Sequence, residues 1–124
     1  MEYRDALPAG CPPDEAEEIA ATTDIYRLVR NNPPSADDFL SQQSLNPSRS
    51  FGSAGCMARG LSVRRTKSAC ELMLKLPRFT GASVCLVRLM PGHGRIQQTG
   101  KAQHYTWWPH RGFNHATCTQ IIAA

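Results

Sequence analysis

Side chains capable of chemistry concentrate in residues 103–109, which read Gln-His-Tyr-Thr-Trp-Trp-Pro and hold both tryptophans of the chain. Side chains alternate between two faces along a strand, which here gives His104, Thr106 and Trp108 on one face and Tyr105 and Trp107 on the other. Histidine transfers protons near neutral pH, and aromatic rings stack on a base or a nicotinamide. We therefore expect a binding cleft beside this strand, although core packing is the alternative role for either tryptophan.

A candidate anion-binding residue lies on another predicted strand, residues 25–30. There Arg27 shares a face with Ile25 and Val29. An arginine on an apolar face needs an anion or a hydrogen-bonded partner. Two roles stay open for Arg27: a structural ion pair and the binding of a ligand anion.

A third predicted strand, residues 57–65, carries Arg59 on one face and Ser62 on the other. Ser62 follows Gly60, and a glycine permits close approach of another backbone. We count Ser62 and His104 as candidate catalytic residues and Arg59 as a candidate binding residue.

Metal-dependent chemistry fits this composition poorly. Glu71 is the last carboxylate side chain, whereas magnesium-dependent nucleases and two-carboxylate glycosidases need several acids. The spacing of His110, His115 and Cys118 matches no standard zinc motif. The five cysteines form no Cys-x-x-Cys pair, which argues against a disulfide scaffold and favours small buried hydrophobic roles. We predict no metal site.

Charge is distributed very unevenly. Residues 1–40 hold nine acids and three bases, and residues 41–124 hold one acid and eleven bases, so the net charges are −6 and +10. A body this basic should attract an anionic partner: a nucleotide, a nucleic acid or an acidic protein. Alternatively, the acidic segment folds over the basic body and neutralises it.

The length of 124 residues predicts one domain. We assign residues 1–24 to an acidic arm with a short helix after Pro12, and residues 25–124 to a single α+β domain. Its predicted fold is a small mixed or mostly antiparallel sheet of five to six strands with two or three short helices. Helices are expected near residues 36–43 and 68–76, and further strands near 82–90, 95–99 and 116–122.

The helix near residues 68–76 has the strongest signal. Ser68 and Glu71 form a capping-box pattern, and apolar residues recur at helical spacing. These are Ala69, Leu72, Met73 and Leu76. No apolar run approaches the roughly 20 residues that span a bilayer, and the acidic N-terminus has no signal-peptide pattern. We expect no membrane partner and a cytoplasmic location.

Several short segments resemble known proteins. Tyr26-Arg27-Leu28 with Pro33-Pro34, Arg59-Gly60-Leu61-Ser62-Val63, and His104-Tyr105-Thr106-Trp107-Trp108 resemble a group of small bacterial proteins of unassigned function. The first part is also similar to the opening of ADP-ribosyltransferase-like domains. These have a first-strand arginine, a polar turn and a short helix containing phenylalanine.

The resemblance implies an NAD site. Arg27 would hold the phosphates or a ribose, Ser62 would seat the nicotinamide ribose, and Tyr105, Trp107 or Trp108 would stack on a ring. Transferases of this superfamily usually place a catalytic glutamate on a late strand, where this chain has no acid. Relatives such as the RNA 2′-phosphotransferases work with arginine and histidine instead.

Three functions therefore stay open. The first is binding of NAD or a phosphorylated nucleotide in a basic, aromatic-lined cleft. The second is a nucleic-acid-binding module or a metal-independent RNase that uses His104 and His110. The third is a non-enzymatic interaction or inhibitor protein from a mobile element. The first requires Arg27, Ser62 and His104 to converge on one open pocket.

Overall fold

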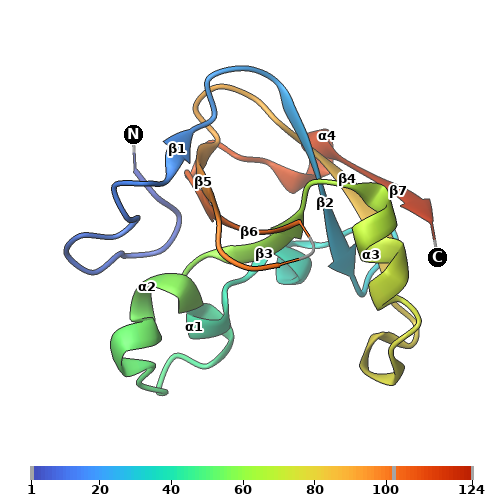
Figure 1. Cartoon of the computed structure of the whole chain (residues 1–124), viewed down its shortest axis with the longest axis horizontal. Coiled ribbons are helices and arrows are strands. Elements are labelled where there is room, and N and C mark those ends of the chain that lie inside the picture. Colours follow the sequence, from blue (N-terminus) through green and yellow to red (C-terminus); the bar gives the residue numbers. More distant parts are fainter. Residues whose placement is uncertain (1, 102, 124) are drawn as a thin grey trace.

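The computed structural model describes residues 2–101 and 103–123, and its strands form one antiparallel sheet of seven strands (Figure 1). The order across the sheet is β1-β5-β6-β3-β2-β4-β7. The strands are β1 (Glu17–Glu18), β2 (Thr23–Val29), β3 (Leu61–Arg64), β4 (Ser83–Leu89), β5 (Gly94–Gln98), β6 (His104–Pro109) and β7 (Thr119–Ala123). The predicted α+β class is confirmed, and the sheet is wider than predicted.

Short helices connect these strands. The α-helices are α1 (Gln42–Leu45), α2 (Gly55–Ala58), α3 (Lys67–Met73) and α4 (His115–Cys118). The 3-10 helices are η1 (Ala36–Phe39), η2 (Gly52–Ala54) and η3 (Pro77–Phe79). None of the helices in the described parts of the chain has the length and apolar character needed to cross a bilayer.

The sheet is nearly divided between β2 and β3. These strands pair at a single position, Tyr26 opposite Arg64. By contrast, β2 pairs with β4 along its whole length, from Thr23 opposite Leu89 to Val29 opposite Ser83. The sheet therefore consists of two well-paired halves that share one short junction.

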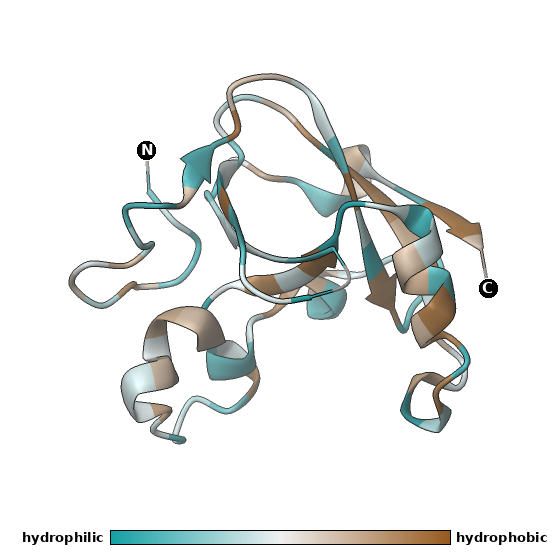
Figure 2. Cartoon of the chain, in the orientation of Figure 1, coloured by the Kyte–Doolittle hydropathy of each residue, from teal (hydrophilic) through white to brown (hydrophobic). Residues whose placement is uncertain are grey.

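One face of the sheet carries the core. Every strand from β2 to β6 contributes to it, as do the phenylalanines of η1 and of the loop after β6. Its fully buried members include Ile25, Val29, Phe39, Val63, Val87, Leu89 and Trp107. Apolar residues accordingly follow β2, β4 and β7, whereas the N-terminal arm and β1 are hydrophilic (Figure 2).

The prediction of a helix after Pro12 is wrong, because part of this segment forms β1, which pairs with β5. Glu17 lies opposite Ile96, and Glu18 lies opposite Arg95 on β5. Ala16 and Ile19 are buried here, but two such residues make an apolar stripe that is too narrow to stabilise a helix. Pairing with β5 satisfies the backbone without that stripe.

Three further predicted boundaries shift. The strand expected over residues 57–65 is confined to β3, because residues 55–58 form α2. The helix expected over residues 36–43 is two pieces, η1 and α1, because Ser41 starts a new turn by accepting a hydrogen bond from the Ser44 N–H. The predicted strand over residues 116–122 begins as α4 and becomes β7 only at Thr119.

The predicted helix near residues 68–76 exists as α3, but its buried side is not the predicted one. Thr66, rather than Ser68, caps it by accepting from the Ala69 N–H at 3.3 Å. Cys70 is its buried residue, whereas the side of Leu72, which is 64% exposed, faces outward. Leu72 and Leu76 of the predicted apolar stripe are therefore exposed at the surface and not packed in the core.

Candidate functional site

Arg27 bridges the divide between the two halves of the sheet. Its Nε donates to the Asp38 carbonyl at 2.9 Å, and its Nη1 donates to the Ser62 carbonyl at 2.6 Å. Burial lowers the pKa of Arg27 to about 10, so the side chain stays a cation at neutral pH. Arg27 therefore has a structural role, but its partners are backbone carbonyls and not the carboxylate of an ion pair. Its Nη2 makes no hydrogen bond to residues 2–101 and 103–123.

The Asp38 carboxylate is committed to the backbone next to Arg27. It accepts from the N–H groups of Arg30 at 2.7 Å and Ser35 at 3.0 Å, and from the Asn31 amide at 3.1 Å. Burial raises the pKa of Asp38, but these hydrogen bonds outweigh burial and lower it. The hydrogen bond from the Ser35 N–H fixes the turn whose carbonyl receives Arg27.

Ser62 and His104 belong to a chain of four hydrogen-bonded side chains on the face opposite the core. The Ser62 Oγ lies 3.1 Å from the His104 Nε2, and the His104 Nδ1 lies 3.1 Å from the Thr99 Oγ1. The Thr99 Oγ1 lies 2.7 Å from the Thr106 Oγ1. The register of β3 and β6 produces this cluster, because it places Ser62 opposite Thr106. We call these four residues the relay.

The relay histidine is held neutral. Burial lowers the pKa of His104, and the nearby Arg64 guanidinium, which lies opposite it in the β3–β6 register, lowers it further. The ordinary value is 6.5, so the imidazole is uncharged at neutral pH. A neutral imidazole flanked by hydroxyls can accept a proton from one of them.

This lowered pKa predicts how stability depends on pH. The folded protein binds the His104 proton more weakly than the unfolded chain, so the contribution is complete above pH 6.5 and is lost as pH falls through the lowered pKa. The urea midpoint should therefore fall between pH 7.5 and pH 5, and His104→Gln should flatten the fall. Burial, followed by His110, also lowers the pKa of His93, so part of the slope should remain. An unchanged slope in His104→Gln would contradict the assignment.

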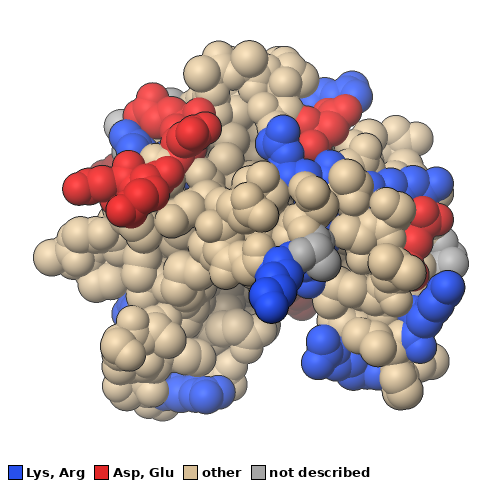
Figure 3. Space-filling view, viewed as in Figure 1, with Lys and Arg blue, Asp and Glu red and all other residues tan. Residues whose placement is uncertain are grey.

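A cleft of about 250 Å³ opens where the two halves of the sheet diverge. Its floor comes from β2 and β3, and its walls come from α1, α3 and η3. The lining residues are Tyr26, Arg27, Leu28, Gln42, Ser62, Arg64, Cys70, Met73 and Phe79. A hollow separates the lobe that contains α1 and α2 from the lobe that contains α3, and Lys or Arg side chains lie on both sides of it (Figure 3).

The cleft is basic and partly aromatic. Two arginines line it, and none of its described lining residues carries a carboxylate. The Phe79 ring has two further guanidinium groups over it, Arg78 at 5.1 Å and Arg30 at 5.7 Å from its centroid. His104 does not line the cleft, but its Nε2 lies 3.1 Å from the hydroxyl of Ser62, which does. Arg27, Ser62 and His104 thus lie together, with Arg27 and Ser62 open to the cleft.

The tryptophans do not fit the predicted stacking role. Trp107 and Trp108 are both 0% exposed. The Trp107 Nε1 donates to the His93 carbonyl at 2.8 Å, and the Trp108 Nε1 donates to the Cys56 carbonyl at 3.0 Å. Both rings are buried: Trp107 belongs to the core, and Trp108 lies on the opposite face of β6. Tyr105 packs against the core and under the Arg65 guanidinium, 5.6 Å from its centroid, away from the cleft.

Two other predicted residues lie elsewhere. Arg59 donates from Nη1 to the Gly55 carbonyl at 2.8 Å, and it lines a separate surface hollow with Arg4 and Asp5. His110 lies six positions from His104 along an extended strand, roughly 20 Å away, and its Nδ1 lies 3.0 Å from the Gly92 carbonyl. The histidine pair required for the RNase hypothesis is therefore not brought together.

Sequence reasoning missed the aromatic residues that do line the cleft. Tyr26 precedes Arg27 on β2 and lines the same cleft, so its position next to a candidate binding residue was the available sequence signal. Phe79 lies in the short η3 after Pro77, where no periodic pattern exists to predict its direction. Thr99 was placed at the end of a predicted edge strand, and only the register of β5 on β6 brings it to His104.

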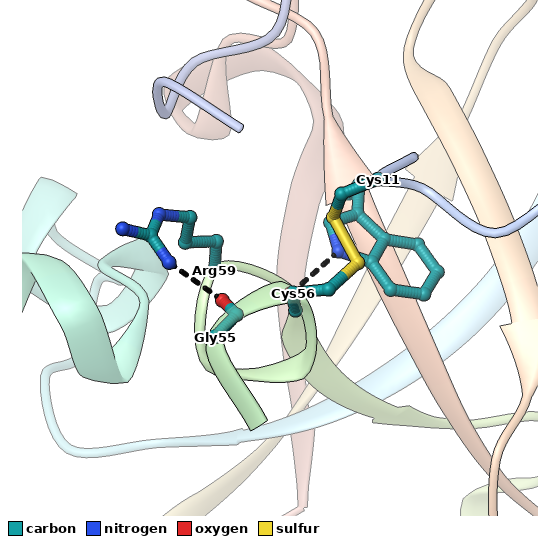
Figure 4. The surroundings of a disulfide bond; sticks show 5 residues. Cys11, Gly55, Cys56 and Arg59 are labelled. Atoms are coloured by element: carbon teal, nitrogen blue, oxygen red, sulfur yellow. Dashed lines mark hydrogen bonds between the residues drawn. A yellow bond between two sulfur atoms is a disulfide. The ribbon is translucent and has the colours of Figure 1, made fainter. Parts of the chain in front are cut away.

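The cysteines also depart from expectation. Cys11 and Cys56 form a disulfide that closes a sequence separation of 45 residues. It ties the N-terminal arm to α2, while the Arg59 side chain turns away from it toward Gly55 (Figure 4). Sequence reasoning argued against a disulfide scaffold and favoured buried hydrophobic roles, because it had no means to detect one bridge between distant segments. Cys70 and Cys85 are buried and free, which agrees with their predicted roles.

Burial raises the pKa of Cys70 and of Cys85 to about 11, so neither thiol is a nucleophile at neutral pH. No cluster of His, Cys, Asp or Glu in residues 2–101 and 103–123 has the arrangement needed to hold a metal ion.

Comparisons with known protein families, with curated proteins and with solved structures found no match. The cleft and the relay are thus the features from which function must be argued.

Proposed function

We propose that the cleft binds NAD or a related phosphorylated nucleotide. The observation that supports this most is the position of the Arg27 guanidinium beside Ser62, at the base of a cleft with two arginines and no lining carboxylate. Such a cleft favours an anion, because its local charge is positive and is partly shielded from water. The resemblance to ADP-ribosyltransferase-like domains assigns Arg27 and Ser62 to the same ligand.

The cleft also offers a place for a base. Tyr26 and Phe79 line it, and the face of an aromatic ring accepts any nucleobase by stacking. The volume of about 250 Å³ lies below the roughly 300–1,000 Å³ of most small-molecule sites. One nucleoside phosphate therefore fills the cleft, and the remainder of a dinucleotide extends over the basic surface around Arg30 and Arg78.

Calorimetric titration with ADP-ribose, NAD and AMP tests this proposal. Arg27→Lys keeps the positive charge but removes the forked donor arrangement, and it should weaken ADP-ribose binding about tenfold to one-hundredfold. Arg59→Gln is the matched control, because Arg59 lies outside the cleft and its loss should leave affinity unchanged. Thermal unfolding of each variant verifies that it is folded.

Two results would contradict nucleotide binding. One is the absence of heat at millimolar concentrations of all three ligands with the folded wild-type protein. The other is a loss of affinity in Arg59→Gln with none in Arg27→Lys, which would mean that general charge rather than the cleft attracts the ligand, because only Arg59→Gln removes a charge. Tyr26→Leu adds a third measurement, since loss of stacking is expected to cost about 1–3 kcal/mol.

A second candidate is binding of single-stranded RNA. The arginines against Phe79, Arg30 and Arg78, provide the combination of cation and aromatic ring that holds such strands. The two candidates differ in their response to salt. RNA binding should weaken steeply between 50 and 200 mM salt, because each neutralised phosphate releases counterions. A mononucleotide should show a much shallower dependence.

A further inference from the structure

A second, apolar groove adjoins the cleft. It measures about 410 Å³ and is lined by Arg64, Thr66, Ser68, Ala69, Leu72, Met73, Leu76 and Gln103. Leu72 is 64% exposed and Leu76 is 41% exposed, although both belong to the stripe that an amphipathic helix normally buries. Arg64 and Met73 line both spaces, so the apolar groove begins where the basic cleft ends.

The relay ends at the same place. Ser62 lies on the cleft floor, two residues from Arg64 on β3, and its hydroxyl lies 3.1 Å from the imidazole of His104. Thr99 and Thr106 fix the other ring nitrogen through the 3.1 Å and 2.7 Å contacts of the relay. A hydroxyl, a base and a group that orients the base are the components of a nucleophilic serine site.

We propose that the protein hydrolyses O-acylated phosphorylated nucleotides, with Ser62 as the nucleophile and His104 as the base. The identity of the alcohol part rests on the proposed nucleotide binding, whereas the reactivity of Ser62 does not. The basic cleft holds the nucleotide and the apolar groove holds the acyl chain. Arg64, which lines both spaces, faces the ester between them.

The reaction proceeds through an acylated serine. The Ser62 Oγ bonds to the ester carbonyl carbon as its proton passes to the His104 Nε2. The bond from carbon to the nucleotide oxygen then breaks, and that oxygen takes the proton from His104. Water attacks the acyl-serine, gives a proton to His104, and releases the carboxylic acid as the proton returns to the Ser62 Oγ. The net reaction consumes one ester and one water and yields one acid and one nucleotide alcohol.

The first experiment uses an alkyl fluorophosphonate, with labelling followed by intact mass and peptide mapping. Ser62 attacks phosphorus, fluoride leaves, and the serine proton is transferred to His104. Labelling should map to Ser62, disappear in Ser62→Ala and slow at least tenfold in His104→Gln. Ser53→Ala and His115→Gln are matched controls outside the relay and should label as the wild type does. Absence of labelling, or labelling unaffected by His104→Gln, would overturn the proposal.

The pH profile separates a catalytic base from a merely structural histidine. Because the basic form of His104 is required, the labelling rate should be high at pH 7.5 and fall as pH decreases through a pKa below 6.5. Thr99→Val removes a positioning hydroxyl, so it should lower the rate and move this inflection. An inflection that stays in place in Thr99→Val would assign Thr99 a structural role and overturn the relay.

The second experiment tests the two subsites. With 4-nitrophenyl acetate and 4-nitrophenyl octanoate, the wild type should favour the longer chain, and Leu72→Gln should reduce that preference several-fold. ADP-ribose should slow fluorophosphonate labelling. Labelling without such protection would refute the nucleotide as the alcohol part while leaving Ser62 reactive. Binding of ADP-ribose without labelling would refute the hydrolase while the proposed nucleotide function stands.

Discussion

Loss of the Cys11–Cys56 disulfide is expected to lower the free energy of unfolding by about 4 kcal/mol. The bridge closes a separation of 45 residues, and closing a loop of that length removes this much conformational entropy from the unfolded chain. Domains of this size typically have about 5–15 kcal/mol of stability, so the bridge supplies a large fraction of it. The effect should be visible as a lower urea midpoint in Cys11→Ser.

The control for this measurement is Cys118→Ser, because Cys118 is free and only partly buried. Its midpoint should stay within about 1 kcal/mol of the wild type. The Trp108 indole donates to the Cys56 carbonyl, so tryptophan fluorescence should also report loss of the bridge. Equal midpoints for oxidised wild type and Cys11→Ser would show that the N-terminal arm is held by its other contacts.

Trp107→Ala is expected to destabilise the protein by about 3–5 kcal/mol. The ring is fully buried and lies 4.7 Å from the Phe113 ring in an edge-on arrangement, so truncation leaves a large cavity. It also leaves the His93 carbonyl, which accepts from the indole at 2.8 Å, without that partner. Much of the sample should be unfolded at modest urea concentrations.

Trp107→Phe separates the two contributions to this effect. It keeps an aromatic ring against Phe113 but removes the indole N–H. It should therefore lower the free energy of unfolding less than Trp107→Ala does, and its effect should come mainly from the lost hydrogen bond because the cavity is smaller. Equilibrium unfolding followed by circular dichroism measures both variants. A shift of less than 1 kcal/mol in Trp107→Ala would contradict the placement of this ring in the core.

The parts of the fold that sequence reasoning predicted are those governed by local periodicity. The strand around Arg27 follows directly from the alternation of apolar side chains, and the strand expected around His104 is also present. Arg27 also lies beside Ser62, as the nucleotide hypothesis requires, because the two residues fall on neighbouring strands.

The parts that failed depend on distant partners. Residues 12–21 have acids and prolines typical of a helix start, but the free edge of β5 offers Glu17 and Glu18 backbone partners. The periodicity of α3 identifies a helix but cannot say which side meets the sheet, and Leu72 faces outward. Trp107 and Trp108 resemble ligand-stacking residues in sequence, because only the tertiary structure shows that both faces of β6 are covered at their positions.

The narrow junction between β2 and β3 gives Arg27 two simultaneous duties. One guanidinium group fastens the two halves of the sheet together through backbone oxygens, and it also sets the electrostatic potential of the opening between them. If the opening binds a nucleotide as proposed, a saturation mutagenesis survey would score this position as intolerant because of both folding and ligand binding. A lysine at this position keeps the cation but loses the fork, so it retains the positive potential of the opening and weakens the connection between the two halves of the sheet.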